Sequence, residues 1–367
     1  MAKRVINFYA GPAGLPLPAL ERAQAELLDF ENTGMSVMEI SHRSKEYEAV
    51  HNEAITLTKE LLAIPDNYKI ILLQGGGHLQ FGMLPMNLLY KGRKADYICT
   101  GSWAEKAFKE GKIVAGDDAR CIATTKEEKY ARLPRREEIR VNPDSVYVHF
   151  TSNNTVEGTQ WQSFPEAGSV PLVCDMSSDF LWRPFDIAPF GLIYAGAQKN
   201  LGPSGVTVVI IREDLLAQCL DKELPSYLRY RIHVEKNSLY NTPPTFGIYI
   251  LRNVLAYNKS IGGLAAIEKN NRMKGELLYG CIDRYPSFYK PFVTVPADRS
   301  LMNVDFFLPT EELTDAFVKG AKAAGMVGLK GYRDIGGIRV SMYNAVTVEN
   351  IRTLVAFMDD FAKRNAQ

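Results

Sequence analysis

Apolar runs of strand length alternate with segments of helical periodicity over most of the chain, and this alternation constrains the fold more than any other feature. Several of the runs are apolar almost throughout, as strands buried on both faces of a sheet should be. Strands that alternate with helices predict a mostly parallel sheet covered by helices, and therefore an α/β fold. The predicted strands lie at 68–73, 95–100, 145–150, 170–174, 192–195 and 206–212, and the clearest helices at 77–89 and 103–114.

The pattern changes near residues 257–263, where Asn258, Gly262 and Gly263 interrupt the helical periodicity. The elements beyond that point predict a smaller α+β domain. We therefore expect a large domain over residues 1–260, with an extended segment at 1–17, and a small domain over residues 261–367. In the small domain we predict a helix from 264 past 279, a strand at 302–308, a helix at 311–324, a strand at 337–342 and a closing helix at 348–363.

Length and charge exclude several classes of protein. The chain has 367 residues, enough for about two domains with sizeable cores. Its 43 Lys and Arg against 42 Asp and Glu leave a net charge of +1, with no basic stripe or amphipathic anchor, so neither nucleic acid nor a membrane is an expected partner. The densest apolar run, 206–211, is too short to cross a membrane, and the N-terminus lacks the apolar stretch of a signal peptide. We therefore expect a cytoplasmic protein.

The cysteines are an odd number and contain no C-x-x-C pair, which is not typical of a disulfide framework or of a zinc site. We predict reduced, mostly buried thiols and no metal. The five are Cys99, Cys121, Cys174, Cys219 and Cys281.

Lys199 lies among small residues in the segment 194–205, directly after a predicted strand. Most loop lysines are simply solvated, but the neighbouring glycines and alanines allow a bulky ligand close to the backbone. A desolvated lysine has a lowered pKa and acts as a nucleophilic amine, which suits Schiff-base chemistry with a carbonyl cofactor. Lys199 is therefore the first candidate catalytic residue.

Asp175 follows the predicted strand 170–174. An acid at the carboxyl end of a parallel strand lies where open α/β sheets bind their ligands. Capping of the following turn through Ser177 or Ser178 explains this aspartate equally well from the sequence alone.

Three glycines at 75–77 stand between a predicted strand and a predicted helix. Such a turn lets backbone N–H groups and a helix N-terminus receive a phosphate, although it matches neither the dinucleotide-binding pattern nor the Walker A pattern. Trp103 follows another strand at the same edge of the sheet, where its ring can face a ligand or fill the core.

Short motifs follow one another along the chain: NFYAGP at 7–12, MEISHR at 38–43, GGG at 75–77, GSW at 101–103, NNT at 153–155, DMSS at 175–178, GAQKN at 196–200, NTPPT at 241–245, KG at 330–331 and GGIR at 336–339. Together they resemble the class V group of the fold-type-I pyridoxal-phosphate enzymes, and the resemblance spans nearly the whole chain. It implies a large domain with a mostly parallel sheet and a smaller C-terminal α+β domain.

The resemblance implies pyridoxal 5′-phosphate as the cofactor. Lys199 would bind it covalently and move the proton at the substrate Cα, Asp175 would pair with the ring nitrogen, and Trp103 would stack on the ring. The other implied cofactor contacts are Thr155 at the phenolic oxygen and, at the phosphate, Gly77, His78, Gln198, and Asn241 and Thr242 from a second subunit.

The resemblance also implies the substrate contacts. Arg339 would bind the α-carboxylate through a bidentate pair. His42, Arg43 and Arg333 of the partner in a homodimer would bind the distal anionic group, although a surface ion-pair patch is the other interpretation of His42 and Arg43. Tyr332 stands where members of the family often have histidine, and it can donate a hydrogen bond but cannot carry a positive charge.

The implied reaction is a ping-pong transamination that converts 3-phosphohydroxypyruvate and L-glutamate into O-phospho-L-serine and 2-oxoglutarate, in L-serine biosynthesis. An aminotransferase of the alanine/serine–glyoxylate type is the alternative. A cysteine desulfurase would have a histidine just before the Schiff-base lysine, where this chain has Gln198. An inactive scaffold would have lost Lys199, Asp175 or Arg339, and all three are present.

Overall fold

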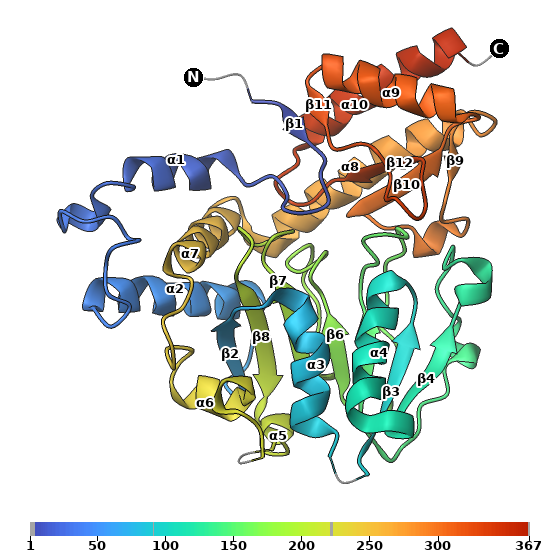
Figure 1. Ribbon diagram of the computed structural model, residues 1–367. Coiled ribbons are helices and arrows are strands. Elements are labelled where there is room, and N and C mark those ends of the chain that lie inside the picture. Colours follow the sequence, from blue (N-terminus) through green and yellow to red (C-terminus); the bar gives the residue numbers. More distant parts are fainter. Residues whose placement is uncertain (1–3, 91, 221–222, 366–367) are drawn as a thin grey trace.

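A seven-stranded sheet forms the centre of the computed structural model, which describes residues 4–90, 92–220 and 223–365 (Figure 1). The strand order is β2-β8-β7-β6-β5-β3-β4. The predicted α/β fold is confirmed, and the six predicted strands lie within a few residues of their expected positions. The strands are β2 (Tyr68–Leu73), β3 (Lys94–Cys99), β4 (Ala119–Thr124), β5 (Ser145–Thr151), β6 (Leu172–Asp175), β7 (Phe190–Gly196) and β8 (Thr207–Arg212).

One strand of this sheet runs against the others. β8 pairs antiparallel with both β2 and β7, whereas the remaining neighbours pair parallel. The connection from β7 to β8 is too short for the helical crossover that a parallel return requires, so the chain reverses direction there. This short connection carries Lys199.

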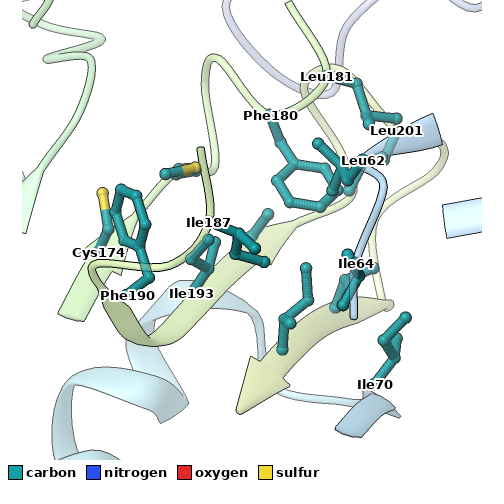
Figure 2. Packing of buried hydrophobic residues seen from close by; sticks show 14 of the residues in the cluster. Leu62, Ile64, Ile70, Cys174, Phe180, Leu181, Ile187, Phe190, Ile193 and Leu201 are labelled. Atoms are coloured by element: carbon teal, nitrogen blue, oxygen red, sulfur yellow. The ribbon is translucent and has the colours of Figure 1, made fainter. Parts of the chain in front are cut away.

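Helices cover both faces of the sheet because successive strand residues point to opposite sides. Ile70 and Leu72 pack in one apolar cluster with α2 (Lys45–Leu61) and α7 (Thr245–Ser260), part of which Figure 2 shows. Their neighbours Ile71 and Leu73 pack in a second cluster on the opposite face. That second cluster also contains residues of α3 (Gly76–Leu88), α4 (Ser102–Ala115), α5 (Glu213–Leu216) and α6 (Tyr230–Glu235).

The C-terminal part has its own apolar core around Val304, Phe317 and Leu354. It contains an antiparallel sheet of order β12-β10-β9. Its elements are α8 (Gly263–Arg284), β9 (Lys290–Pro291), β10 (Asn303–Phe307), α9 (Glu311–Ala323), β11 (Met326–Val327), β12 (Ile338–Ser341) and α10 (Val348–Asn365). The predicted division after residue 260 stays a prediction.

The helix break near that division is narrower than predicted. α7 continues through Asn258 and ends at Ser260, and α8 begins at Gly263. Gly262 and Gly263 have φ angles of 104° and 67°, a conformation that L side chains rarely adopt. The two glycines separate the helices, and the expectation that Asn258 breaks the periodicity was wrong.

The N-terminal segment packs against the C-terminal part of the chain. β1 (Ile6–Asn7) pairs parallel with β11, and Phe8 is buried in the C-terminal core. The backbone N–H of Ala13 donates to the carbonyl of Gln198 at 2.8 Å, which brings this segment beside Lys199. The first helix, α1 (Leu17–Ala25), follows. The start of the predicted extended segment, residues 1–3, lies outside the described residues.

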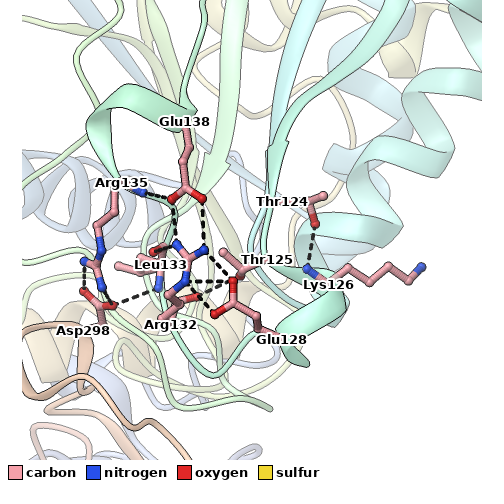
Figure 3. A network of polar contacts seen from close by, with 9 residues as sticks. All are labelled: Thr124, Thr125, Lys126, Glu128, Arg132, Leu133, Arg135, Glu138 and Asp298. Carbon is pink, nitrogen blue, oxygen red and sulfur yellow. Dashed lines mark hydrogen bonds and ion pairs between the residues drawn. The ribbon is translucent and has the colours of Figure 1, made fainter.

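A polar network joins the loop after β4 to the segment before β10 (Figure 3). Asp298 accepts bidentate hydrogen bonds from Arg135 at 2.9 and 3.0 Å, and a third from the backbone of Leu133 at 3.0 Å. Arg132 forms ion pairs with Glu128 and Glu138 in the same loop. Because Asp298 is buried, these contacts hold the two parts of the chain together.

All five cysteines are free; Cys121 is exposed and the other four are buried. No group of metal-ligating side chains occurs within residues 4–90, 92–220 and 223–365. In the same part of the chain, no helix combines the length and apolar character needed to cross a membrane.

Candidate active site

The candidate residues gather at the carboxyl edge of the parallel strands, where open α/β sheets bind ligands. Asp175 ends β6, Lys199 follows β7, Thr155 follows β5, and Trp103 lies in the first turn of α4, after β3. In Figure 1 this edge faces the three-stranded sheet, from which Arg339 of β12 reaches it.

Lys199 is half-buried, and its Nζ donates to Thr155 Oγ1 at 2.6 Å. Burial lowers its pKa from 10.5 to about 8, and the negative charge of Asp175 partly opposes that shift. A larger fraction of the amine is therefore neutral near pH 7 than for an ordinary lysine, as a nucleophile requires.

Asp175 is 5% exposed, and its Oδ1 accepts a hydrogen bond from the backbone N–H of Ser177 at 2.9 Å. Burial raises the pKa of this carboxyl, whereas the charge of Lys199 and the Ser177 hydrogen bonds lower it. The turn-capping interpretation of Asp175 is confirmed, because Oδ1 caps the turn that follows β6. The other oxygen, Oδ2, faces Gly77: a Cβ on that glycine would lie 3.8 Å from it.

Trp103 forms one wall of the site. Lys199 Nζ lies 5.7 Å from the centre of its ring, and His78 contacts the ring edge to face at 5.2 Å. The indole Nε1 is buried and has no hydrogen-bond partner among the described residues. The ring therefore borders Lys199 and does not lie in the interior of the core.

The glycine turn begins α3. Gly75 and Gly76 have φ angles of 90° and 64°, which explains the glycines at these two positions. The first turn of a helix leaves N–H groups without intrahelical acceptors, here those of Gly77 and His78, and such groups suit a phosphate. On the lysine loop, Gln198 packs over Gly196 so closely that a Cβ on Gly196 would lie 2.7 Å from Gln198 Oε1.

Arg339 approaches from β12. Its Nη1 donates to the carbonyl of Thr155 at 3.3 Å, and its guanidinium lies 5.6 Å from the centre of the Tyr332 ring. The guanidinium and the Lys199 amine thus contact the backbone and the side chain of the same residue.

Other predicted residues are not brought to this cluster within the described chain. Arg43 is exposed, His42 is half-buried with an unpartnered Nε2, and Arg333 is exposed and lies 3.5 Å from Asp334. Asn241 Nδ2 donates to the carbonyl of Thr242, which also accepts from Gln74 beside the glycine turn. No hydrogen bond, ion pair or ring contact joins these residues to Lys199 among the residues described.

Over residues 5–354 the chain matches the family model of the class-V aminotransferases. The chain belongs to this family. The sequence-based prediction of family, enzyme class and fold type is thereby confirmed.

Three relatives of this class-V aminotransferase are informative. The phosphoserine aminotransferase of Lysinibacillus sphaericus is 54% identical over 365 residues, covering 100% of both chains. The structure of phosphoserine aminotransferase from Bacillus circulans subsp. alkalophilus is 52% identical, with a TM-score of 0.96 over 99% of both chains. The PLP-bound phosphoserine aminotransferase of Trichomonas vaginalis is 38% identical, with a TM-score of 0.92 over 97% of this chain and 100% of that one.

The site of this class-V aminotransferase fits pyridoxal phosphate. A reactive amine, a buried acid and an aromatic wall converge, and Gly77 adds no side chain of its own to the space beside Asp175. A buried acid is the group that a protonated ring nitrogen requires. The cofactor predicted from the resemblance is confirmed, whereas the roles of the individual residues stay predictions.

Sequence reasoning missed two buried acids in this class-V aminotransferase. Glu157 is 3% exposed and accepts hydrogen bonds from the backbone N–H and the hydroxyl of Ser102, at 2.8 and 2.5 Å. Asp305 is 4% exposed and lies on β10 opposite Arg339. The available signal was one charged residue inside the otherwise apolar run 304–308.

Proposed function

We propose that this class-V aminotransferase is a phosphoserine aminotransferase, which converts 3-phosphohydroxypyruvate and L-glutamate into O-phospho-L-serine and 2-oxoglutarate. The observation that carries the proposal is full-length identity of 54% and 52% to proteins of that name. The convergence of Lys199, Asp175 and Arg339 on one edge of the sheet supports it.

Lys199 and Asp175 divide the proton chemistry. When bound, pyridoxal phosphate supplies an electron sink for the electron pair left at the substrate Cα. Lys199, with its pKa lowered to about 8, is suited to accept and return the Cα proton. Burial raises the pKa of Asp175, while Lys199 and Ser177 favour its charged form, in which it is suited to keep a proton on the ring nitrogen.

Trp103, Thr155 and Arg339 orient the reactants. The Trp103 ring borders the space in front of Lys199 and is suited to stack on the cofactor. Thr155 Oγ1 lies 2.6 Å from Lys199 Nζ and is suited to bind the phenolic oxygen next to that nitrogen. Arg339 presents a guanidinium for the α-carboxylate, the group shared by both amino acids of the reaction.

The distal anion of the substrates requires cationic groups besides Arg339, and the described residues of a single chain place none of the predicted ones at Lys199. We assign this role to His42, Arg43 and Arg333 of a second copy, with Tyr332 of this chain beside Arg339. The assignment makes the functional unit a homodimer with shared sites, in which Asn241 and Thr242 also cross to the partner and bind the cofactor phosphate. A cytoplasmic location stays a prediction.

The half-reactions test the proposal separately. The purified holoenzyme is mixed first with L-glutamate and then with 3-phosphohydroxypyruvate, and the visible absorbance of the bound cofactor is recorded, with Lys199→Ala in parallel. We expect glutamate to bleach the band and the phosphorylated keto acid to restore it, and the mutant to do neither. A band that glutamate leaves unchanged while alanine or serine bleaches it would favour the glyoxylate-type alternative.

A further inference from the structure

Asp305 is a buried carboxylate beside the proposed substrate arginine. In the antiparallel pair of β10 and β12 it lies directly opposite Arg339. Such cross-strand partners project to the same face of the sheet, with Cβ atoms about 4.5–5.5 Å apart. Asp305 is 4% exposed, and neither of its oxygens accepts a hydrogen bond from any described residue. A buried carboxylate without donors is costly, so this position needs a reason.

The chain makes room for this carboxylate. A Cβ on Gly158 would lie 2.9 Å from Asp305 Oδ2, so the loop after β5 carries a glycine where it passes the acid. The preceding residue, Glu157, is also buried, and its Oε2 has no donor although Ser102 binds its Oε1. Two acids from different elements, Asp305 and Glu157, are therefore buried near each other, and Asp305 lies opposite Arg339.

Arg339 lies opposite Asp305, but no hydrogen bond or ion pair joins the two side chains among the described residues. The one hydrogen bond of the Arg339 guanidinium within the described chain goes to an uncharged carbonyl, that of Thr155 at 3.3 Å. A substrate carboxylate at Arg339 would be the third negative group near a single positive one. Binding is more favourable when at least one of the acids is neutral.

The groups that face Asp305 come from four elements. They are Arg339 on β12, Glu157 in the loop after β5, Tyr279 on α8 and Tyr343 after β12. Lys290 on β9, the strand on the other side of β10, lies opposite Phe307 and is exposed. Burial raises the pKa of the Asp305 carboxyl, and Glu157 raises it further, whereas Arg339 lowers it. Burial also raises the pKa of both tyrosines, which keeps them neutral near pH 7.

We infer that Asp305 is a positioning residue that acts through Arg339: its negative charge opposes a second carboxylate at that guanidinium, and by taking up a proton from solvent Asp305 removes the opposition. The inference rests on the proposed function, because it requires Arg339 to bind that carboxylate. Ionised Asp305 repels the substrate carboxylate at Arg339, and protonated Asp305 does not. Substrate binding is therefore coupled to proton uptake, and it weakens as the pH rises.

The test uses 2-oxoglutarate and the holoenzyme with its cofactor in the aldehyde form. In that form the cofactor has no amino group to give to this keto acid, so binding is measured without reaction. Calorimetric titrations in two buffers of different ionisation enthalpy count the protons taken up. For the wild type we expect uptake on binding and a Kd that rises by up to about tenfold per pH unit. Asp305→Asn keeps the shape and removes the charge, so we expect less uptake, a flatter pH dependence and tighter binding at high pH.

Asp298→Asn is the matched control, since Asp298 is also a buried aspartate facing an arginine, Arg135, but that arginine lies outside the site. It should keep the wild-type proton uptake. The visible absorbance of the cofactor reports any proton bound near Lys199, so that contribution is subtracted separately.

Three outcomes would count against the inference. Unchanged uptake and pH dependence in Asp305→Asn would overturn it while leaving the proposed function intact. If Asp305→Asn does not fold, the absence of any proton uptake by the wild type between about pH 6 and 9 would overturn it. A wild type that binds 2-oxoglutarate neither in the aldehyde form nor in the aminated form would contradict the proposed function itself, and the inference with it.

Discussion

Lys199 and Lys274 both have pKa values lowered by burial, to about 8 and about 7, yet their surroundings differ. Lys274 Nζ donates to the backbone carbonyls of Met342 and Tyr343 at 2.7 and 2.8 Å, and these bonds fix the position of the side chain. Lys199 Nζ donates to the hydroxyl of Thr155, which can also donate and does not require a charged partner. Burial therefore lowers the pKa of both lysines, but Lys274 is held in place by two carbonyls, whereas Lys199 is available as a reactive amine.

We predict that Lys274 makes the stability of the fold depend on pH. Between about 7 and 10.5 the unfolded chain binds a proton at this lysine that the folded chain does not, so the free energy of unfolding rises with pH in that window. The slope is on the order of 1.4 kcal/mol per pH unit. Lys274→Met should remove this part of the slope in urea unfolding measured at several pH values, and an unchanged slope would contradict the prediction.

We predict that Asp175→Asn slows the glutamate half-reaction by about 100-fold or more, because the amide cannot hold a charged ring nitrogen. The mutant should still bind the cofactor through Lys199, so its visible band should persist while stopped-flow bleaching slows. Asp179→Asn is the control: this buried acid binds Ser152 and Gln160 and does not face Gly77. An equal loss in the control would point to general damage.

At the residue scale, the sequence predicts chemistry only where a motif surrounds it. Lys199, Asp175 and Trp103 lie in motifs, and the structure brings them together. Asp305 could not be found this way, because its importance comes from the register that places it opposite Arg339. Register depends on which strands pair, and a single run of residues does not determine pairing.

At the scale of elements, the apolar pattern located most strands but not their directions. β4 was not predicted because only two of its six residues, Ala119 and Ala123, are buried, as is common at a sheet edge. β8 is buried along nearly its whole length, as are the parallel strands, so its reversed direction leaves no mark in the pattern. The reversal is encoded instead by the short connection that carries Lys199.

We predict that Gly331→Ala opens the loop over residues 331–337. A Cβ on Gly331 would lie 1.8 Å from the carbonyl oxygen of Gly336, and the Gly331 N–H donates to Gly337 at 2.8 Å. The clash should displace Tyr332 and Arg333, so kcat/KM for 3-phosphohydroxypyruvate should fall by about 100-fold. Steady-state kinetics against both substrates measures the effect.

Gly280→Ala is the matched control for that variant. Gly280 is exposed within α8, and a Cβ there would meet no atom within 4 Å. Removing a helical glycine should stabilise the fold by about 0.5–1 kcal/mol and leave kcat/KM unchanged. Equal losses in both variants would show that the 331–337 loop has no special role in substrate binding.

At the scale of the whole molecule, a site built from two chains predicts that two inactive variants can restore activity when they form a hybrid dimer. Lys199→Ala and Arg43→Ala homodimers should each be inactive, for different reasons. A hybrid dimer of the two has one site with both residues intact, so an equal mixture, unfolded and refolded together, should recover about a quarter of the wild-type activity. Activity assays before and after subunit exchange measure this, and no recovery despite hybrid formation would show that each site takes Lys199 and Arg43 from the same chain.

Assembly is the level at which the sequence says least by itself. The exposed Arg43 and Arg333 have the same character as ordinary surface arginines, since nothing local marks a side chain that a second copy will cover. The family resemblance supplied that expectation, and the hybrid experiment is its direct test.

The pairing of β1 with β11 also affects how the molecule is made. Met326, the partner of Ile6, is synthesised 320 residues after it (326 − 6). At about 5–20 residues per second, that interval is on the order of tens of seconds. Throughout it, the segment that will lie beside Lys199 has no strand to pair with, so the catalytic loop gains this neighbour in its final place only after Met326 has been made.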